Sequence, residues 1–296
     1  MAGQEGRIHP PLRIHPEAGL ERIAELVTAD TLAWRPFPGV GRLEEWVPDT
    51  LELWVVRELG PSLPENLRRP EAWVAGVAHP ESGRIALRTG ADQELLAGLR
   101  AVFRHELAHL ALHHATAGNY PRWLGEGYAQ YAAGLWSWEE AWQLRLVFFR
   151  RGGVALRNLD LRFQREPVEV RLGYLLSYTV VHELAGLAGE PGLAALFTRL
   201  RAGDSIDQGL RAVYGMTLEQ FERRWRKSVL DRYGWLYLVS RAAVFWLAVT
   251  ILVLLVSIRR ARQDRRRLAA LRAAEAAEEA AGATDPQEVD AERHRG

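Results

Sequence analysis

Cysteine is absent from this chain of 296 residues, and lysine occurs once, as Lys227. Without cysteine the protein has neither disulfide bonds nor thiolate ligands for a metal, although this absence is compatible with either side of a membrane. Acidic and basic residues balance to a net charge of +1, so the chain lacks the basic surplus that nucleic acids attract. We therefore expect no nucleic-acid partner.

No signal peptide is recognisable either. Residues 1–30 contain no apolar core behind a basic start, which is the pattern of an export signal. Residues 1–16 are rich in proline, histidine and arginine, and we expect them to be a flexible N-terminus. A chain of this length can hold one domain of roughly 200 residues with appendages, and we place that domain at residues 17–230.

A metal-protease motif stands near the middle of the chain, where residues 105–109 read His-Glu-Leu-Ala-His. Residues four apart lie on one face of a helix, so His105 and His109 can present imidazole nitrogens to the same ion. Zinc takes such ligands at about 2.0–2.1 Å in a tetrahedral shell. Glu106 stands beside the first histidine, where a carboxylate can take a proton from a zinc-activated water molecule.

The residues around this motif favour a buried helix. Apolar residues interleave with it, and neither glycine nor proline occurs between Leu99 and Ala117. Gly118 and Asn119 then end the helix, and Pro121 follows. A catalytic zinc site needs a rigid helix, so this context lowers the chance that the motif is accidental.

A third ligand is available in the segment 121–127, which reads Pro-Arg-Trp-Leu-Gly-Glu-Gly. Glu126 lies 17 positions after His109 and opens a second segment with helical periodicity. Two helices joined by a short Gly/Pro turn can bring Glu126 to the open side of the ion. Two histidines and one glutamate leave a fourth position for water, which is the catalytic arrangement and not the closed structural one.

The two motifs resemble those of the gluzincin metallopeptidases, whose best-known members are thermolysin and the zinc aminopeptidases. The chain is most similar to the small bacterial peptidase MA-like proteins, over roughly residues 15–230. The resemblance implies a zinc metallopeptidase that hydrolyses peptide bonds, with one Zn²⁺ ion and a peptide or protein substrate. It implies His105, His109 and Glu126 as metal ligands and Glu106 as general base.

One position departs from the family pattern. In thermolysin-like enzymes an aspartate one turn after the glutamate ligand orients a ligand histidine, and this chain has Gln130 there. An amide oxygen accepts an imidazole N–H more weakly than a carboxylate does. The departure therefore bears on metal affinity more than on mechanism.

A gluzincin also needs a donor to the oxyanion, and the segment 173–178 offers two tyrosines. Tyr174 and Tyr178 share a helix face, in a segment that is similar to the Tyr-x-x-Ser helix of the peptidase MA-like proteins. We favour Tyr174 as the catalytic donor. The alternative is that both are ordinary half-buried helix residues whose hydroxyl groups need only some partner.

Strands are predicted ahead of the motif. Residues 51–56 read as a strand, and residues 73–78 and 84–88 read as a β-hairpin around a loop rich in turn residues. In gluzincins a small sheet lies over the active helix, and its edge strand pairs with the substrate backbone. We place that contact at residues 75–78, where small side chains allow close approach. A purely structural hairpin is the alternative.

A long apolar run stands near the C-terminal end of the sequence. Leu236–Ile258 has Arg241 as its only charge, and roughly 20 apolar residues span a bilayer core. We expect a single transmembrane helix at residues 236–258, so that the membrane bilayer is a second partner. Residues 259–296 follow as a basic and then Ala/Glu-rich tail. The arginines after the span favour a cytoplasmic C-terminus and an extracytoplasmic catalytic domain at the cell membrane. Basic residues also precede the span, so a catalytic domain that faces the cytoplasm is the alternative.

The remaining chain is predominantly helical. Helices are expected at 137–151, 174–187, 192–201, 205–214 and 218–230. Turn residues at 189–191 and 203–204 separate them, and Thr217 begins a capping box. The expected class is α+β and mostly helical: a small N-terminal sheet over a zinc-binding helix pair, a helical C-terminal part, and the membrane helix.

Two functions are compatible with these features. The first is a membrane-anchored zinc metallopeptidase with Glu106 as base and Tyr174 as oxyanion donor. The second is a catalytically inactive, peptidase-like scaffold that binds zinc and interacts with partners at the membrane. Retention of Glu106 favours the enzyme, because a structural zinc site has no use for a base there. The substrate, the endopeptidase or aminopeptidase mode and the oligomeric state are left open by the sequence.

Overall fold

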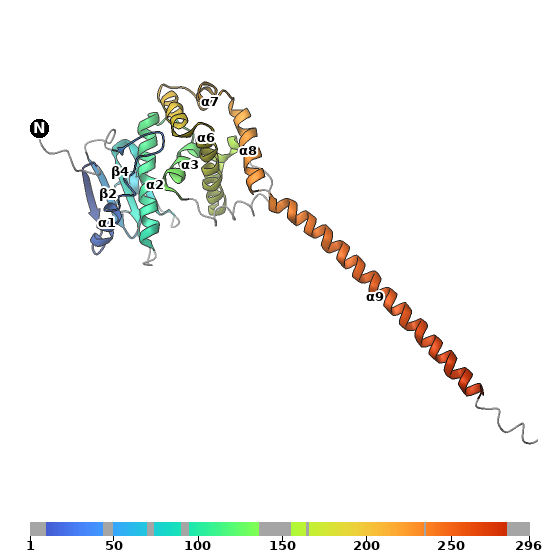
Figure 1. Ribbon diagram of the computed structural model, residues 1–296. Coiled ribbons are helices and arrows are strands. Elements are labelled where there is room, and N and C mark those ends of the chain that lie inside the picture. Colours follow the sequence, from blue (N-terminus) through green and yellow to red (C-terminus); the bar gives the residue numbers. More distant parts are fainter. Residues whose placement is uncertain are drawn as a thin grey trace, which may run out of the picture. The chain divides into compact units, whose positions relative to one another are not determined.

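The computed structural model describes most of the chain, namely residues 10–43, 50–69, 74–89, 95–135, 155–163, 166–233 and 235–282. The chain divides into two compact units, Met1–Leu236 and Tyr237–Gly296. The first unit is mostly helical with one small sheet, as predicted (Figure 1). The helix expected at 137–151 lies outside the described residues.

The sheet has four strands in the order β1-β2-β4-β3. β1 (Leu12–Pro16), β2 (Leu51–Val56) and β4 (Arg84–Arg88) run parallel, and β3 (Gly76–His79) joins β4 antiparallel at one edge. The 3-10 turn η3 (Pro80–Ser82) connects β3 to β4. The strand at 51–56 and the hairpin are therefore confirmed.

The expectation of a flexible segment over residues 1–16 was wrong for its last part. Residues 12–16 form β1, which pairs with β2 along its whole length, from Leu12 beside Leu51 to Pro16 beside Val55. Leu12 and Ile14 alternate with polar residues and pack against the hydrophobic core. This pairing between distant segments orders a stretch whose composition alone is typical of a loop.

Both faces of the sheet are covered. Alternate residues of a strand point to opposite faces, so Leu53 and Val55 join the main core with Phe103 of α2 (Leu95–Thr116). Val56 instead joins a smaller cluster with Leu67 of the 3-10 turn η2 (Glu65–Leu67). Helix α1 (Glu21–Thr28) also packs on α2, which lies beside the sheet in Figure 1.

The sequence predicted that the second helix begins at Glu126. Helix α3 (Arg122–Ala133) begins one turn earlier, at Arg122. Pro121 provides no side-chain cap, but Asp160 of α5 (Leu159–Arg162) accepts a hydrogen bond from the Trp123 N–H at 2.8 Å. A carboxylate at a helix N-terminus satisfies a free N–H and favours the dipole. The cap from α5 therefore stabilises a first turn of α3 that the sequence around Glu126 did not predict.

The C-terminal part of the first unit is helical. The 3-10 turn η4 (Leu156–Asn158) leads directly into the short helix α5, and the long helix α6 begins at Pro167. The predicted break occurs at Gly189, where φ is 65° and ψ is −162° within α6. The other helices are α6 (Pro167–Arg201), α7 (Ile206–Tyr214) and α8 (Leu218–Tyr233).

The predicted capping box at the start of α8 is confirmed. The Gln220 N–H donates to the Thr217 hydroxyl oxygen at 3.1 Å, and the Thr217 N–H donates to the Gln220 side chain at 2.8 Å. Ser205 and Gln208 form the same reciprocal pair at the start of α7. Each box satisfies two helix-end donors and fixes where its helix begins.

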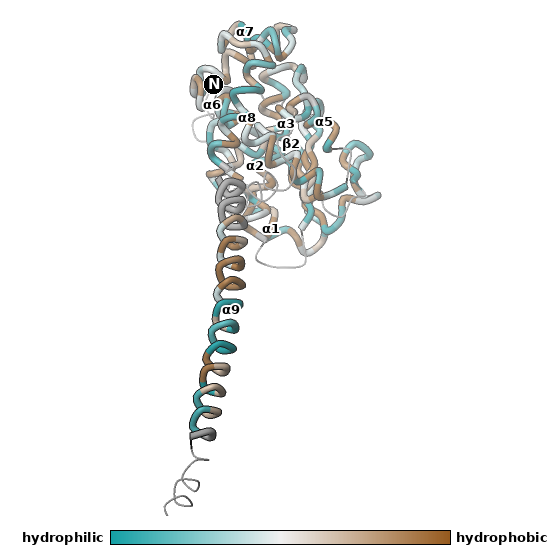
Figure 2. Tube along the Cα trace, turned by 90° about the vertical axis from the view of Figure 1, so that its right-hand side faces the viewer, coloured by the Kyte–Doolittle hydropathy of each residue, from teal (hydrophilic) through white to brown (hydrophobic). Residues whose placement is uncertain are grey.

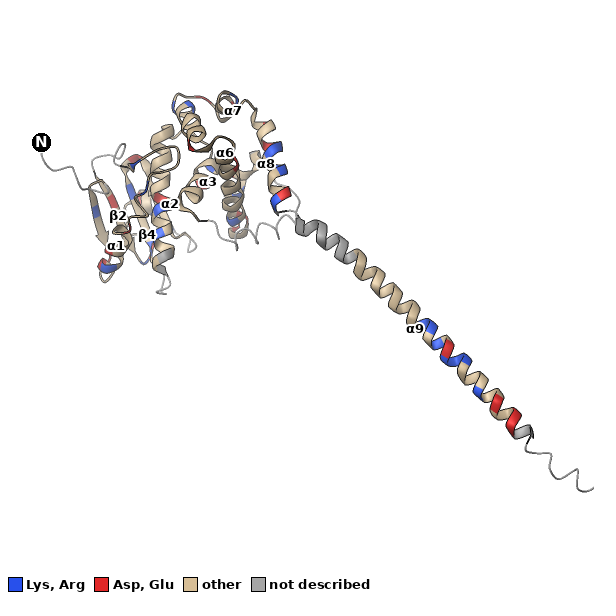
Figure 3. Cartoon of the chain, viewed as in Figure 1, with Lys and Arg blue, Asp and Glu red and all other residues tan. Residues whose placement is uncertain are grey.

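Helix α9 (Trp235–Gly282) forms most of the second unit. Figure 2 shows an apolar stretch followed by a polar one, and Figure 3 shows that, among the residues it colours, charges follow that apolar stretch. Side chains are described from Phe245 onward, and Arg259 interrupts the apolar run soon after. Within the described residues no helix is apolar over a length that could cross a membrane, so the predicted span at 236–258 is not confirmed.

Helices α3 and α6 approach each other closely at Gly127. A Cβ atom added there would lie 2.2 Å from the Ser177 carbonyl oxygen and 2.6 Å from its carbon. Both obstacles are backbone atoms, which cannot move aside as a flexible side chain can. Glycine at this position therefore sets the distance between the helix that carries Glu126 and the helix that supports it.

We predict that Gly127→Ala lowers the free energy of unfolding by roughly 1–3 kcal/mol, the usual range for overpacking. Gly186→Ala is the matched control, because Gly186 is an exposed residue of α6 with nothing within 4 Å of an added Cβ. That variant should gain about 0.5–1 kcal/mol from helix propensity. Urea unfolding of both chains measures the difference, and equal effects would contradict the close approach.

Candidate metal centre

Helix α2 presents two imidazoles from successive turns. His105 and His109 are four residues apart, which places them on one face of the helix. Their Nε2 atoms lie 3.2 Å from each other. The flanking residues Leu107 and Ala108 are fully buried, so the sequence pattern predicted the core side of this helix correctly. The packing of those neighbours fixes the direction in which the imidazoles point.

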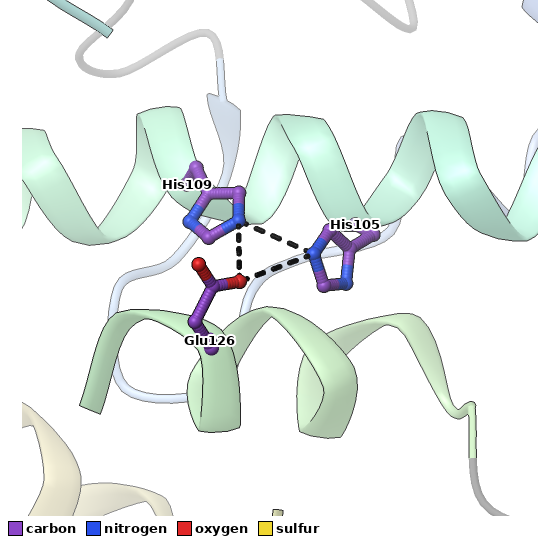
Figure 4. Close-up of side chains that lie close together, drawn as sticks. All are labelled: His105, His109 and Glu126. Atoms are coloured by element: carbon purple, nitrogen blue, oxygen red, sulfur yellow. Dashed lines mark hydrogen bonds and ion pairs between the residues drawn. The ribbon is translucent and has the colours of Figure 1, made fainter. Parts of the chain in front are cut away.

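Helix α3 brings a carboxylate to the same place. Figure 4 shows the Glu126 side chain pointing from α3 toward His109, with His105 to one side. The Glu126 Oε2 atom lies 3.6 Å from the His109 Nε2 atom and 3.8 Å from the His105 Nε2 atom. The structure therefore brings together the three residues that the sequence analysis selected, which form the one such group within the described part of the chain.

The distances fit a small divalent cation. Ligands about 2.0–2.1 Å from a tetrahedral zinc ion lie about 3.4 Å apart, close to the spacing of these donor atoms. Two nitrogen donors and one oxygen donor are a set that zinc commonly accepts, and three protein ligands leave one position open. His105, His109 and Glu126 can thus hold a catalytic type of metal site without rearrangement.

The charges within this group also suit a cation. Burial and the charge of His109 lower the pKa of His105 to about 3. Burial opposes protonation of His109 too, but the hydrogen bond and charge of Glu126 outweigh it and raise the pKa of His109. Burial likewise raises the pKa of Glu126, and the bonded imidazoles outweigh it and lower that pKa. The Glu126 carboxylate therefore favours a positive charge beside it, which a bound metal ion would supply.

The Glu106 carboxyl is buried beside the histidines. Burial raises its pKa to about 7, although the charges of His109 and Arg69 and a hydrogen bond from the Ala78 backbone act in the opposite direction. The edge strand β3 passes directly over this side chain. A Cβ atom on Gly76 would lie 2.7 Å from the Glu106 Oε1 atom, so glycine is needed for the strand to come so near.

An open cavity of about 580 Å³ lies next to the metal ligands. Strand β3 forms one wall with Gly76, Val77 and Ala78, and helices α2 and α3 form the floor. Tyr174 of α6 also lines the cavity, with its ring centroid 6.4 Å from that of His105. Burial and the charge of Glu126 raise the pKa of Tyr174, so its hydroxyl keeps its proton at neutral pH.

Tyr178 does not reach this cavity. Its ring packs against Tyr131 and His182 at centroid distances of 6.2 and 5.8 Å. The two tyrosines share a helix face, but they occupy different environments one turn apart. Of the two candidates from the sequence, only Tyr174 lies beside the metal ligands.

Gln130 does not take the place of the orienting aspartate of the related enzymes. The His105 Nδ1 atom is buried and has no hydrogen-bond partner among the described residues. No hydrogen bond joins Gln130 to either ligand histidine in that part of the chain. His105 is therefore positioned by packing and by its neighbours in the metal group.

Sequence reasoning missed several residues of the cavity wall. Tyr120, Arg122 and Phe163 line it, and so does Arg69 from the loop before β3. Arg122 could have been found, because it precedes Glu126 by four residues and shares its helix face. The other three come from loops far apart in the sequence, and no local pattern indicates that they meet.

Comparison with known proteins agrees with this site. Residues 54–231 match the family model of the Peptidase MA superfamily, which is more than half of the chain. The match extends from within β2 to within α8 and includes both helices that carry the metal ligands. It confirms the family resemblance of the two motifs. No match is found among the curated proteins.

We predict that the purified chain binds about one divalent ion, and that His105→Ala and Glu126→Gln each lose it, because only three protein ligands are available. His182→Ala is the control. His182 belongs to a similar His-Glu sequence, but its Nδ1 atom lies near Arg232 at 3.4 Å and outside the metal cavity. Elemental analysis after dialysis gives the metal content, and equal metal in all four proteins would disprove the assignment.

Proposed function

The chain belongs to the Peptidase MA superfamily, and we propose that it is a zinc-dependent metallopeptidase of the gluzincin type. The observation that carries this proposal is the convergence of His105, His109 and Glu126 at an open cavity that Glu106 also lines. A buried base beside an incomplete metal shell is the arrangement that hydrolysis of an amide requires. The membrane location and its orientation stay predictions from the sequence.

Each residue then has a separate task. A zinc ion held by His105, His109 and Glu126 would polarise the scissile carbonyl and lower the pKa of a water molecule. Glu106 accepts the proton of the attacking water and delivers it to the nitrogen of the leaving amine. The Glu106 carboxyl lines the same cavity as the three metal ligands.

Tyr174 is suited to stabilise the oxyanion. Its hydroxyl is a donor at neutral pH, since burial raises the pKa of this side chain. A preorganised donor in a partly desolvated site stabilises developing negative charge far better than water does. Tyr174 is carried by α6, and its ring packs against Phe163 at the end of α5, at a centroid distance of 5.3 Å.

Strand β3 offers a surface for the peptide backbone. It pairs with β4 on one side and is the edge of the sheet on the other. An extended peptide can add to such an edge through backbone hydrogen bonds. Gly76 and Ala78 carry little side-chain volume where the strand lines the cavity, so a substrate could lie close to Glu106.

An inactive zinc-binding scaffold is the competing function. The environment of Glu106 argues against it, because a carboxyl with a strongly raised pKa is destabilised by its own burial. Metal binding does not need this residue. A buried and costly carboxyl beside the open side of a metal group is typical of a catalytic base.

Glu106→Gln tests the function directly. The amide keeps the size of the side chain but cannot accept a proton, so we expect peptide hydrolysis to fall by about a thousandfold, in the range for a general base. The metal content should not change. Mass spectrometry of a broad peptide library measures the hydrolysis. A metal-loaded parent chain that cleaves no peptide, or no more than the variant, would instead support the scaffold.

A pair of conservative substitutions tests the oxyanion donor. Tyr174→Phe removes only the hydroxyl and should lower kcat roughly 100-fold while KM changes little, as for loss of one such donor. Tyr178→Phe makes the same change one turn away and outside the cavity, so it should leave kcat within about twofold. Similar kinetics for the two variants would contradict the role of Tyr174.

A further inference from the structure

The cavity beside the metal group has an uneven distribution of charge. Apart from the metal ligands, its described lining contains three charged side chains, Glu106, Arg69 and Arg122. The only carboxylates of the lining are thus the proposed base and a metal ligand. Both arginines therefore add positive charge to a cavity that would also hold a cation. This electrostatic environment favours a substrate that carries negative charge.

Arg122 is the better placed of the two. It begins α3, and its guanidinium carbon lies 4.7 Å from the centroid of the Phe163 ring. Its Nε atom lies 3.4 Å from the Glu126 Oε1 atom. The guanidinium also acts on Tyr174, whose pKa it lowers by its charge and a hydrogen bond. The Phe163 ring therefore holds the Arg122 guanidinium next to the metal ligands. Glu126 and Tyr174 also contact this guanidinium.

Glu126 does not neutralise Arg122. The contact is long for a charge-assisted hydrogen bond, and the Arg122 side chain remains 48% exposed. The other oxygen of Glu126 faces the imidazoles and would be shared with a metal ion. Arg122 therefore keeps both charge and N–H donors for another anion. The planar fork of a guanidinium matches the two oxygens of a carboxylate.

We propose that Arg122 is a specificity-determining residue, which binds a carboxylate of the substrate within about one residue of the scissile bond. The carboxylate belongs either to an aspartate or glutamate side chain or to a free C-terminus. This inference rests on the proposed function and adds the class of substrate to it. The Phe163 face restrains the guanidinium, so little conformational freedom is lost when an anion binds.

Binding of labelled peptides tests this inference without hydrolysis. The full chain carrying Glu106→Gln is loaded with zinc, and fluorescence anisotropy measures its affinity for octapeptide pools. Each pool has Asp, Glu, Asn or Gln at a fixed central position, and each is made with a free and with an amidated C-terminus. We expect carboxylate peptides to bind about tenfold more tightly than their amide counterparts, as one charged hydrogen-bonded pair provides.

Two substitutions in the same background assign the effect. Arg122→Gln should abolish the preference, so that carboxylate and amide peptides bind about equally, because it removes the charged guanidinium. Arg171→Gln removes one positive charge from an exposed residue of α6 outside the cavity and should leave the preference intact. If amidation of the C-terminus weakens binding, the recognised group is the terminal carboxylate. If exchange of Asp for Asn or of Glu for Gln in the peptide weakens binding, the recognised group is a side-chain carboxylate.

Other results overturn the inference. An equal affinity for carboxylate and amide peptides, or a preference that survives Arg122→Gln, excludes carboxylate recognition by Arg122. Loss of zinc from the Arg122→Gln chain would show that this residue instead positions Glu126. If none of the peptides binds, the inference fails. Hydrolysis of the peptide library by the parent chain then shows whether the proposed function still stands.

Discussion

The structure depends on three polar side chains that meet between two helices. His105 and His109 on α2 and Glu126 on α3 are all removed from water to a large degree, and a lone charge there would be costly. Together they compensate one another, because the Glu126 carboxylate lies within 4 Å of both imidazoles and raises the pKa of His109 against the effect of burial. The relative position of α2 and α3 is what makes this compensation possible.

That position is fixed from several directions. Arg104, next to His105, donates to the Ala132 carbonyl oxygen at 2.7 Å and so ties α2 to the end of α3. Asp160 holds the other end of α3 through the Trp123 N–H. Gly127 lets α6 approach to backbone contact on the far side. Helix α3 is therefore constrained at both ends and along its length, and Glu126 has little freedom to move away from the histidines.

Local patterns in the sequence predicted much of this arrangement. The spacing of His105 and His109, the capping box at Thr217 and the break at Gly189 each depend on residues within one or two turns. The hairpin of β3 and β4 is also local. Strand β1 depends instead on parallel pairing with β2, whose residues lie 39 positions further along the chain. The start of α3 depends on Asp160, which lies 37 positions beyond Trp123.

The cavity wall shows the same limit more sharply. Arg122 shares a helix face with Glu126 and was within reach of a periodicity argument, whereas Tyr120 and Phe163 face the cavity only because α3, α5 and α6 pack together. Helical periodicity also could not separate Tyr174 from Tyr178. Four residues advance a helix by about 6 Å, so only one of two such side chains can approach a given atom, and the packing of α6 decides which.

The edge strand β3 and the proposed base Glu106 lie in close contact at Gly76. The peptide proposed to lie along β3 must come within reach of Glu106, and the strand itself must therefore pass close over that carboxyl. At Gly76 even a methyl group would collide with the Glu106 Oε1 atom and with Val102 of α2, each at 2.7 Å. A larger residue would push the strand away or displace the base. Glycine at this position therefore lets β3 approach the Glu106 carboxyl, whose burial raises its pKa.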